Sequence, residues 1–167
     1  MAGYVIHIAI AQEYLKKNNI KDQNSEFING VIAPDLTKIK SETHYGEKPP
    51  KTNLKKFLMS NNIDTSYQKG FFLHLITDYL FYNKYLEYYT KEQLHHEYDL
   101  LNDYIIEKYK IRIPQQVQNQ IFSEQGSPQI LTKQLVDKFI EEVSNINLQQ
   151  VKKEVQEQPE KWLEFKN

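Results

Sequence analysis

The chain has 167 residues, a net charge of -1 and no cysteine. This length predicts one domain, residues 1–167, whose core is large enough to fold without disulfides. The near-neutral charge gives no global field that would recruit nucleic acid or anionic lipid. Because thiolates are excluded, any metal ion must be bound by nitrogen and oxygen ligands.

The N-terminus and the apolar segments indicate where in the cell the protein is expected. The N-terminus lacks the basic region and long apolar run of a secretory signal. No stretch reaches the roughly 18 apolar residues of a membrane span. We therefore expect a cytoplasmic protein without a membrane-spanning helix.

The first predicted helix covers residues 4–17 and is apolar on nearly every face, so we expect it to be buried. It contains His7. A single buried histidine is most often a hydrogen-bonded core residue, and a metal ligand is the alternative. A second helix, over residues 25–32, is expected to stop at Pro34. Asp35, which follows directly, has the ordinary interpretation of a turn residue or a cap.

A long loop is predicted over residues 35–50, and loops of this length are often functional. It contains His44, for which plain solvent exposure is the simplest interpretation. A short helix over residues 53–60 is expected next.

The longest predicted helix is capped by Thr65 and runs to about residue 89. Its stretch 71–82 is apolar on every face, which indicates a central helix. His74 and Asp78 are four residues apart and therefore share one face. A carboxylate in such surroundings needs a cation or several hydrogen bonds. The pair either fastens two helices together or belongs to a metal site.

Another helix is predicted from the capping-box pair Thr90 and Gln93 to about residue 109. His95 and Asp99 are again four residues apart, and His96 also shares a face with Asp99. The periodicity leaves open whether His95 or His96 is the ligand, and we expect one of the two to face solvent.

Three further helices are expected: a short one from Pro114, one over residues 129–143 opened by Ser127-Pro128, and one over residues 148–156. No segment has sustained strand alternation. The sequence thus predicts an all-α, single-domain multi-helix bundle. Its metal-site part covers about residues 1–110, and a C-terminal helical part covers about residues 111–167.

All five histidines fall within the first 100 residues, each in or near a candidate site. Together with the carboxylates they supply enough ligands for one to three ions. Neutral imidazole and carboxylate ligands without thiolate suit zinc, with manganese or iron as alternatives.

The order of these residues resembles the zinc-dependent phospholipase C superfamily, an all-helical group that also includes fungal single-strand nucleases. The likeness is strongest to short bacterial proteins placed with that family without a settled activity, and it covers about residues 1–105. The matching motifs are His7, Gly30-x-x-x-Pro34-Asp35, Thr43-His44-Tyr45-Gly46, Gly70-x-x-x-His74-x-x-x-Asp78 and His95-x-x-x-Asp99.

The resemblance implies a cluster of zinc ions between helices. One site would be formed by His44, His74 and Asp78. Asp78 would bridge to a second ion, held also by His7 and by the free amine of Ala2 once Met1 is removed. A third ion would use His95 and Asp99, and Asp35 would orient or deprotonate the attacking water.

One departure from the family affects the third site. The family has a further histidine shortly after the position of Asp78, and residues 79–84 contain none. We therefore expect one or two zinc ions.

The activity implied is metal-dependent hydrolysis of phosphoester bonds, in the manner of a phospholipase C or phosphodiesterase. The partner would be a phosphate-containing small molecule, a lipid head group or a nucleotide, with no stable nucleic-acid partner. The alternative is a metal-stabilised helical binding protein without catalysis. A closed site with four protein ligands favours that alternative, and an open position favours hydrolysis. An HD-type phosphohydrolase would need a histidine directly followed by aspartate, and the chain has none.

Overall fold

The computed structural model describes residues 2–46, 51–85 and 91–162, and its secondary structure is helical. Within these residues there is no strand, and only an isolated bridge joins Tyr45 to Thr52. The prediction of an all-α multi-helix domain is confirmed. The helices are α1 (Tyr4–Lys17), α2 (Glu26–Leu36), α3 (Lys40–His44), α4 (Leu54–Ser60), α5 (Ser66–Tyr85), α6 (Lys91–Tyr109), α7 (Lys133–Ser144) and α8 (Leu148–Glu157), with the short 3-10 helices η1 (Gln23–Ser25), η3 (Gln115–Gln120) and η4 (Pro159–Lys161).

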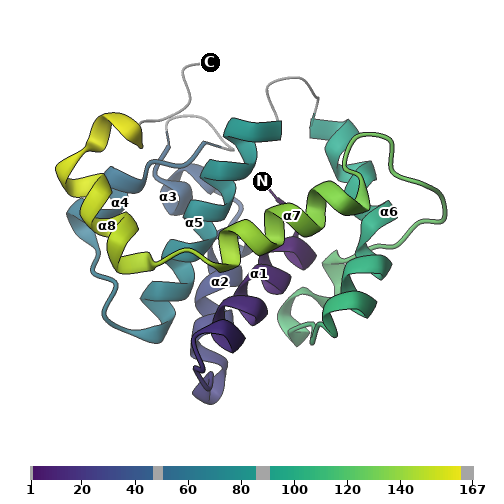
Figure 1. Ribbon diagram of the computed structural model, residues 1–167, viewed down its shortest axis with the longest axis horizontal. Coiled ribbons are helices and arrows are strands. Elements are labelled where there is room, and N and C mark those ends of the chain that lie inside the picture. The colour runs from purple at the N-terminus through teal and green to yellow at the C-terminus, as the bar shows by residue number, and fades with distance from the viewer. Residues whose placement is uncertain (1, 47–50, 86–90, 163–167) are drawn as a thin grey trace.

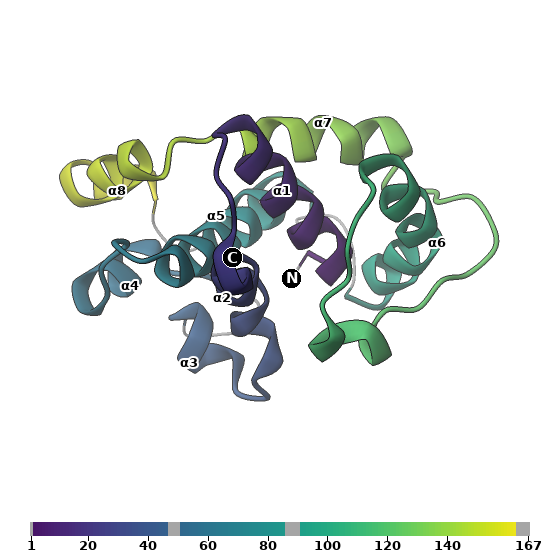
Figure 2. The same ribbon diagram turned by 90° about the horizontal axis from the view of Figure 1, so that it is seen from below.

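Helices α1, α2 and α5 lie at the centre of the molecule. α2 packs along α5, and α1 contacts α2, α5, α6 and α7. α4 and α8 lie together at one end, and α6 lies at the other (Figures 1 and 2). The seven residues 5–11 of α1 are all buried, as the apolar sequence predicts. Among the described residues, no helix is long and apolar enough to cross a membrane.

Two glycines set the distance between α2 and α5. A Cβ at Gly30 would lie 2.0 Å from the carbonyl oxygen of Tyr67, and a Cβ at Gly70 would lie 2.1 Å from that of Phe27. Only glycine lets two backbones approach this closely. The crossing brings the C-terminal end of α2 against the middle of α5, where His74 and Asp78 lie.

The end of α2 differs from the prediction. The helix continues through Pro34 to Leu36, whereas we expected it to stop before the proline. A helix leaves its last carbonyl groups without partners, and here side chains supply the donors. The Thr43 hydroxyl donates to the carbonyl of Pro34 at 2.9 Å, and the Tyr4 hydroxyl donates to that of Asp35 at 2.9 Å. These contacts satisfy two carbonyls that the C-terminal end of α2 leaves free.

The segment before α7 also corrects a prediction. Residues 129–132 are not helical, and α7 begins at Lys133 with Thr132 as its N-cap. The buried Glu97 carboxylate accepts hydrogen bonds from the backbone N–H groups of three consecutive residues, at 2.7 to 2.9 Å. A carboxylate that accepts from three N–H groups satisfies these donors as well as a helix would. The helix therefore does not begin at Ser127-Pro128, as their capping pattern predicted. The donors are Gln129, Ile130 and Leu131.

Other boundaries agree more closely. Thr65 caps α5, because its Oγ1 accepts a hydrogen bond from the Gln68 N–H at 3.1 Å. The loop predicted over residues 35–50 contains the short helix α3, which carries His44. Thr90 and residues 86–89 lie outside the described residues, so the capping box predicted there is untested.

Candidate metal centre

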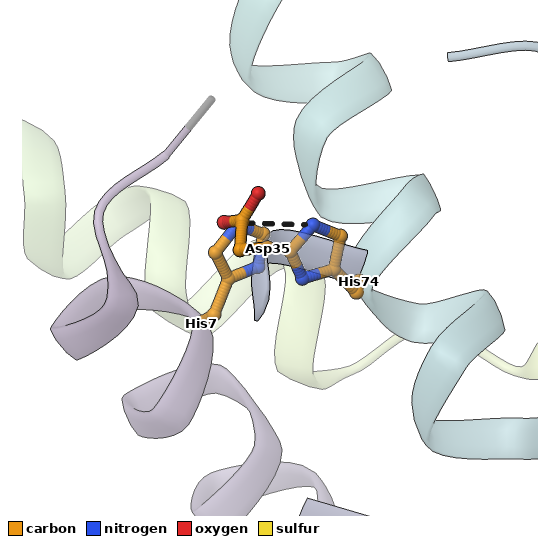
Figure 3. Close-up of side chains that lie close together, drawn as sticks. All are labelled: His7, Asp35 and His74. Carbon is orange, nitrogen blue, oxygen red and sulfur yellow. Dashed lines mark ion pairs between the residues drawn. The ribbon is translucent and has the colours of Figure 1, made fainter. Parts of the chain in front are cut away.

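Five of the predicted site residues converge at the centre of the fold, and each is at most 6% exposed. Their side chains form two groups in which potential ligand atoms lie within 4.8 Å of one another. One group is His44, His74 and Asp78; the other is His7, Asp35 and His74. In Figure 3, the side chains of His7, Asp35 and His74 point toward one another from α1, α2 and α5.

The first group forms a small triangle of ligand atoms. Asp78 Oδ2 lies 3.1 Å from His44 Nε2 and 3.2 Å from His74 Nε2. The two imidazole nitrogens are 3.3 Å apart. A tetrahedral zinc ion at about 2.0–2.1 Å from each ligand separates the ligand atoms by about 3.3–3.4 Å. The triangle therefore has the size that a zinc ion requires.

The other ring nitrogens decide what these atoms can do. His74 Nδ1 lies 2.7 Å from the carbonyl oxygen of Val31, and His44 Nδ1 lies 3.1 Å from that of Lys40. A carbonyl oxygen only accepts, so in each neutral ring the proton is on Nδ1 and the Nε2 lone pair faces the triangle. Histidines that bind metals are usually held in this way.

Three acceptors thus face one another in a buried space. Two imidazole lone pairs and a carboxylate oxygen repel unless a cation lies among them. That cation is either a proton shared within the group or a metal ion. The donor set and its dimensions fit a divalent ion of the zinc type.

Asp35 stands beside this triangle at longer distances. Its Oδ1 is 3.6 Å from His44 Nε2, and its Oδ2 is 3.8 Å from His74 Nε2. Asp35 Oδ2 is buried and has no hydrogen-bond partner. An unpaired buried carboxylate oxygen is costly, so this atom is suited to bind a cation or a water molecule at the fourth position of the site.

His7 lies on the other side of Asp78. Its Nε2 is 3.1 Å from Asp78 Oδ1, which also accepts a hydrogen bond from the Ala2 backbone nitrogen at 2.9 Å. The His7 ring stacks on that of His74 with centroids 3.8 Å apart, and its buried Nδ1 has no partner. Both oxygens of Asp78 are therefore engaged, one toward each side of the cluster.

The charges around the cluster shift the pKa values of its two stacked histidines in opposite directions. Burial lowers the pKa of His7, and the neighbouring charge of His74 lowers it further. Burial also opposes protonation of His74, but the carboxylates of Asp35 and Asp78 outweigh it and raise the pKa of His74. Burial raises the pKa of Asp78, yet nearby positive charge, including His7 and His74, and the His44 hydrogen bond hold it well below its usual range. The pKa values of the two stacked histidines are thus shifted in opposite directions, up for His74 and down for His7.

Two neighbours of Asp35 were not predicted from the sequence. The Lys40 ammonium donates to the Asp35 carbonyl at 2.6 Å and to Asp35 Oδ1 at 3.1 Å, and 23% of the Lys40 side chain is exposed. The Tyr4 hydroxyl donates to the same carbonyl, and burial and the Asp35 charge raise the pKa of Tyr4 to about 12. Neither residue has a recognisable motif, because the Lys40 contacts arise where α3 folds back on α2 and the Tyr4 contact arises where α1 packs against α2.

The remaining predicted ligands lie elsewhere. His95 and Asp99 are in neither ligand group and line a separate cavity beside the start of α1. Burial and the charge of Glu124 raise the pKa of Asp99. His96 is more than half exposed and lies 3.1 Å from the Glu124 carboxylate. Within the described residues, the structure does not bring His95 or His96 together with Asp99 into a group of three metal ligands.

Comparison with known proteins does not add to this geometry, because no protein-family model, no curated protein and no solved structure matches the chain.

Proposed function

We propose that the chain is a metal-dependent hydrolase of phosphoester bonds that holds one or two zinc ions at this centre, and that it is related to the zinc-dependent phospholipase C superfamily. The observation that carries the proposal is the triangle of His44, His74 and Asp78. Its ligand atoms are 3.1 to 3.3 Å apart, and both ring nitrogens present lone pairs.

The position of Asp35 supports catalysis over a purely structural site. Structural zinc sites are usually closed by four protein ligands, whereas catalytic sites have three and keep one position open. Here three atoms are close together, and the Asp35 oxygens are farther away, at 3.6 and 3.8 Å. In this proposal Asp35 accepts a hydrogen bond from the attacking water and takes up its proton.

A bound zinc ion supplies Lewis acidity toward phosphoryl oxygens and lowers the pKa of water towards about 7. The chain's own groups complete the site. His74 and His44 are held in one tautomer by backbone carbonyls, so they do not need to reorient on metal binding. The partly exposed Lys40 ammonium lies beside Asp35 and would neutralise charge on an incoming phosphate.

A second ion is supported by the other half of the cluster. His7 Nε2 and the Ala2 nitrogen both contact Asp78 Oδ1. Removal of Met1 would turn the Ala2 nitrogen into a free amine, which is the ligand that the resemblance implies. Asp78 would then bridge the two ions, one on each oxygen.

The second candidate function is a metal-stabilised binding protein. It is favoured by burial, because all five residues of the centre are nearly inaccessible. In that case the ion would hold α1, α2, α3 and α5 together, and Asp35 would move in to complete a closed site.

The test combines metal content with activity. We expect about one to two equivalents of zinc in the purified protein by elemental analysis, and chelator-sensitive hydrolysis of bis(p-nitrophenyl) phosphate. Asp35→Asn should retain metal and lose at least about 100-fold in kcat, in line with the loss of a general base. His74→Ala should lose both metal and activity.

Two exposed residues provide matched controls, Asp64→Asn and His96→Ala, which should behave as the wild type. Full metal content in His74→Ala would refute the centre itself. Zinc binding without any chelator-sensitive hydrolysis would refute the enzymatic proposal and favour the binding protein.

A further inference from the structure

Another cavity lies at the opposite end of α1 from the metal centre. Its volume is about 350 Å³, within the range of ligand pockets. It is bounded by the last turn of α1 with the residues that follow, by the start of α5, and by the connection between α7 and α8 (Figure 2). Lys17 lines this cavity and follows His7 on the same helix by ten residues, or about 15 Å along the helix axis. The cavity is therefore separate from the metal centre.

The charged side chains that line this cavity are cationic. Among the described residues of its wall, Lys17 and Lys69 carry charge and there is no carboxylate. The Lys17 ammonium donates to Ser144 Oγ at 2.7 Å and to Glu141 Oε2 at 2.8 Å, and the Glu141 side chain is 68% exposed and lies outside the wall. Lys69 forms no ion pair within the described part of the chain. An anion that enters the cavity is therefore attracted, above all by the uncompensated Lys69.

The first turn of α8 adds backbone donors to the same wall. Its N-cap is Asn147, whose side-chain oxygen accepts a hydrogen bond from the Gln150 N–H at 3.0 Å. The first N–H groups of a helix have no partner within that helix, and the first two of α8 belong to Leu148 and Gln149, which both line the cavity. Ammonium groups and backbone N–H groups around one space are the donors that phosphate groups bind.

The other polar groups of the wall are amides. The side-chain nitrogen of Asn18 donates to the Tyr14 carbonyl at 2.8 Å, and that of Asn145 donates to the Glu141 carbonyl at 2.8 Å. Among the described residues, neither amide oxygen receives a hydrogen bond, so both can accept one from a ligand hydroxyl. Tyr14 is the one aromatic residue of the described wall and is buried. The wall thus suits a hydroxylated ligand better than one that must stack, such as a nucleobase.

We propose that this cavity binds a small phosphorylated polyol, such as a sugar monophosphate. Lys69 and the first N–H groups of α8 hold the phosphate group, and Lys17 adds a second positive charge. The amide oxygens of Asn18 and Asn145 accept hydrogen bonds from the hydroxyl groups of the ligand. The residues of this site are absent from both groups of potential metal ligands among the described residues, so binding does not depend on zinc or on the hydrolase proposal.

The experiment uses the full chain as purified. Glucose 6-phosphate is titrated and followed by calorimetry and by the backbone amide NMR signals of Leu148 and Gln149, with glucose and inorganic phosphate as comparison ligands. We expect glucose 6-phosphate to bind more tightly than inorganic phosphate, and glucose to bind at least about tenfold more weakly because it lacks the charge. Phosphate bound at the metal centre would instead shift the signals of His44 and Asp78, so the two sites are distinguished.

Two substitutions test the two kinds of donor. Lys69→Gln should weaken binding of glucose 6-phosphate about tenfold, as loss of a hydrogen bond to a charged group does, and Lys69→Arg should retain most of the affinity. Asn147→Asp keeps an equally good N-cap but places a negative charge on the wall of the cavity. It should leave the fold intact and weaken binding at least about tenfold.

Lys16→Gln is the matched control, because Lys16 is an exposed lysine next to Lys17 that does not line the cavity. It should leave the affinity unchanged. Equal affinity for glucose, unchanged affinity in Asn147→Asp, or a Lys16 effect as large as that of Lys69 would overturn the proposal. Signal changes confined to the metal centre would also overturn it. Binding at Leu148 and Gln149 in a protein that lacks zinc or hydrolase activity would uphold this site alone.

Discussion

Each histidine of the triangle is held by its second ring nitrogen. For His74 the partner is a backbone carbonyl of α2, at 2.7 Å. For His44 it is the Lys40 carbonyl, supplemented by the Thr43 hydroxyl at 3.1 Å from Nδ1. The Thr43 hydroxyl itself donates to the carbonyl of Pro34. One side chain therefore connects the end of α2 to the orientation of a potential metal ligand.

Replacing Thr43 by valine tests this link, because valine keeps the shape and loses the hydroxyl. We expect Thr43→Val to weaken zinc binding about tenfold, as loss of a ligand's outer partner typically does. The measurement is competition with a chromogenic chelator at constant pH. Thr37→Val is the control, since the Thr37 hydroxyl accepts a hydrogen bond from the exposed Ile39 N–H and Thr37 belongs to neither group of potential metal ligands among the described residues. Equal zinc affinities in the two variants would contradict the role of Thr43.

That His7, His74 and Asp78 need partners could be predicted at the residue scale, because a polar group in an apolar helix needs one. Asp35 and His44 were expected at a turn and in a loop, and only the family resemblance placed them in the same site. His95 could not be assigned from its spacing. A His-x-x-x-Asp pair gives a shared face but not what lies opposite, and here a cavity lies opposite.

At the scale of elements, the crossing of α2 and α5 builds the centre. Gly70 precedes His74 by one turn, and Gly30 precedes Asp35 by five residues. Each glycine lies against a backbone carbonyl of the other helix. The glycines in these two motifs thus have a physical role, which is to let the ligand-bearing turns approach each other.

A methyl group added at Gly70 should push α2 and α5 apart. In Gly70→Ala the new Cβ would be 2.1 Å from the Phe27 carbonyl oxygen, so α2 and α5 must move apart. Overpacking of this kind costs about 1–3 kcal/mol or more of unfolding free energy, measured by urea denaturation. Zinc affinity should fall as well, because His74 recedes from Asp35. The control is Glu26→Ala, an exposed change on α2, and stability of Gly70→Ala equal to that control would contradict the close crossing.

Helices with strong apolar patterns, such as α1, could be predicted to the residue. The errors fall where tertiary hydrogen bonds replace local ones. The end of α2 continues past Pro34 to Leu36, where Thr43 and Tyr4 donate hydrogen bonds to its final carbonyls. Residues 129–131 stay out of α7 because Glu97 captures their N–H groups. Local propensity contains no information about either partner.

At the scale of the whole molecule, the centre joins helices that are far apart in the chain. Its potential ligands come from α1, α2, α3 and α5, so binding of a metal ion there would be coupled to folding. An ion that binds only the folded chain stabilises it by about 4 kcal/mol at a concentration 1,000 times its dissociation constant. Zinc should therefore raise the melting temperature, and chelator should lower it.

This stabilisation should depend on pH, because zinc competes with the proton on His74. The pKa of His74 is raised in the folded chain without metal, so that proton stabilises the fold below about pH 6.5, and its contribution is lost as the pH rises through the raised value. Zinc needs the neutral ring, so its contribution grows over the same range. We expect the difference in melting temperature between zinc-loaded and chelated protein, measured by calorimetry from pH 5 to pH 8, to be small in acid and to increase with pH. In His74→Ala the difference should be small at every pH, whereas a zinc effect independent of pH in the wild type would mean that the imidazoles do not bind the ion.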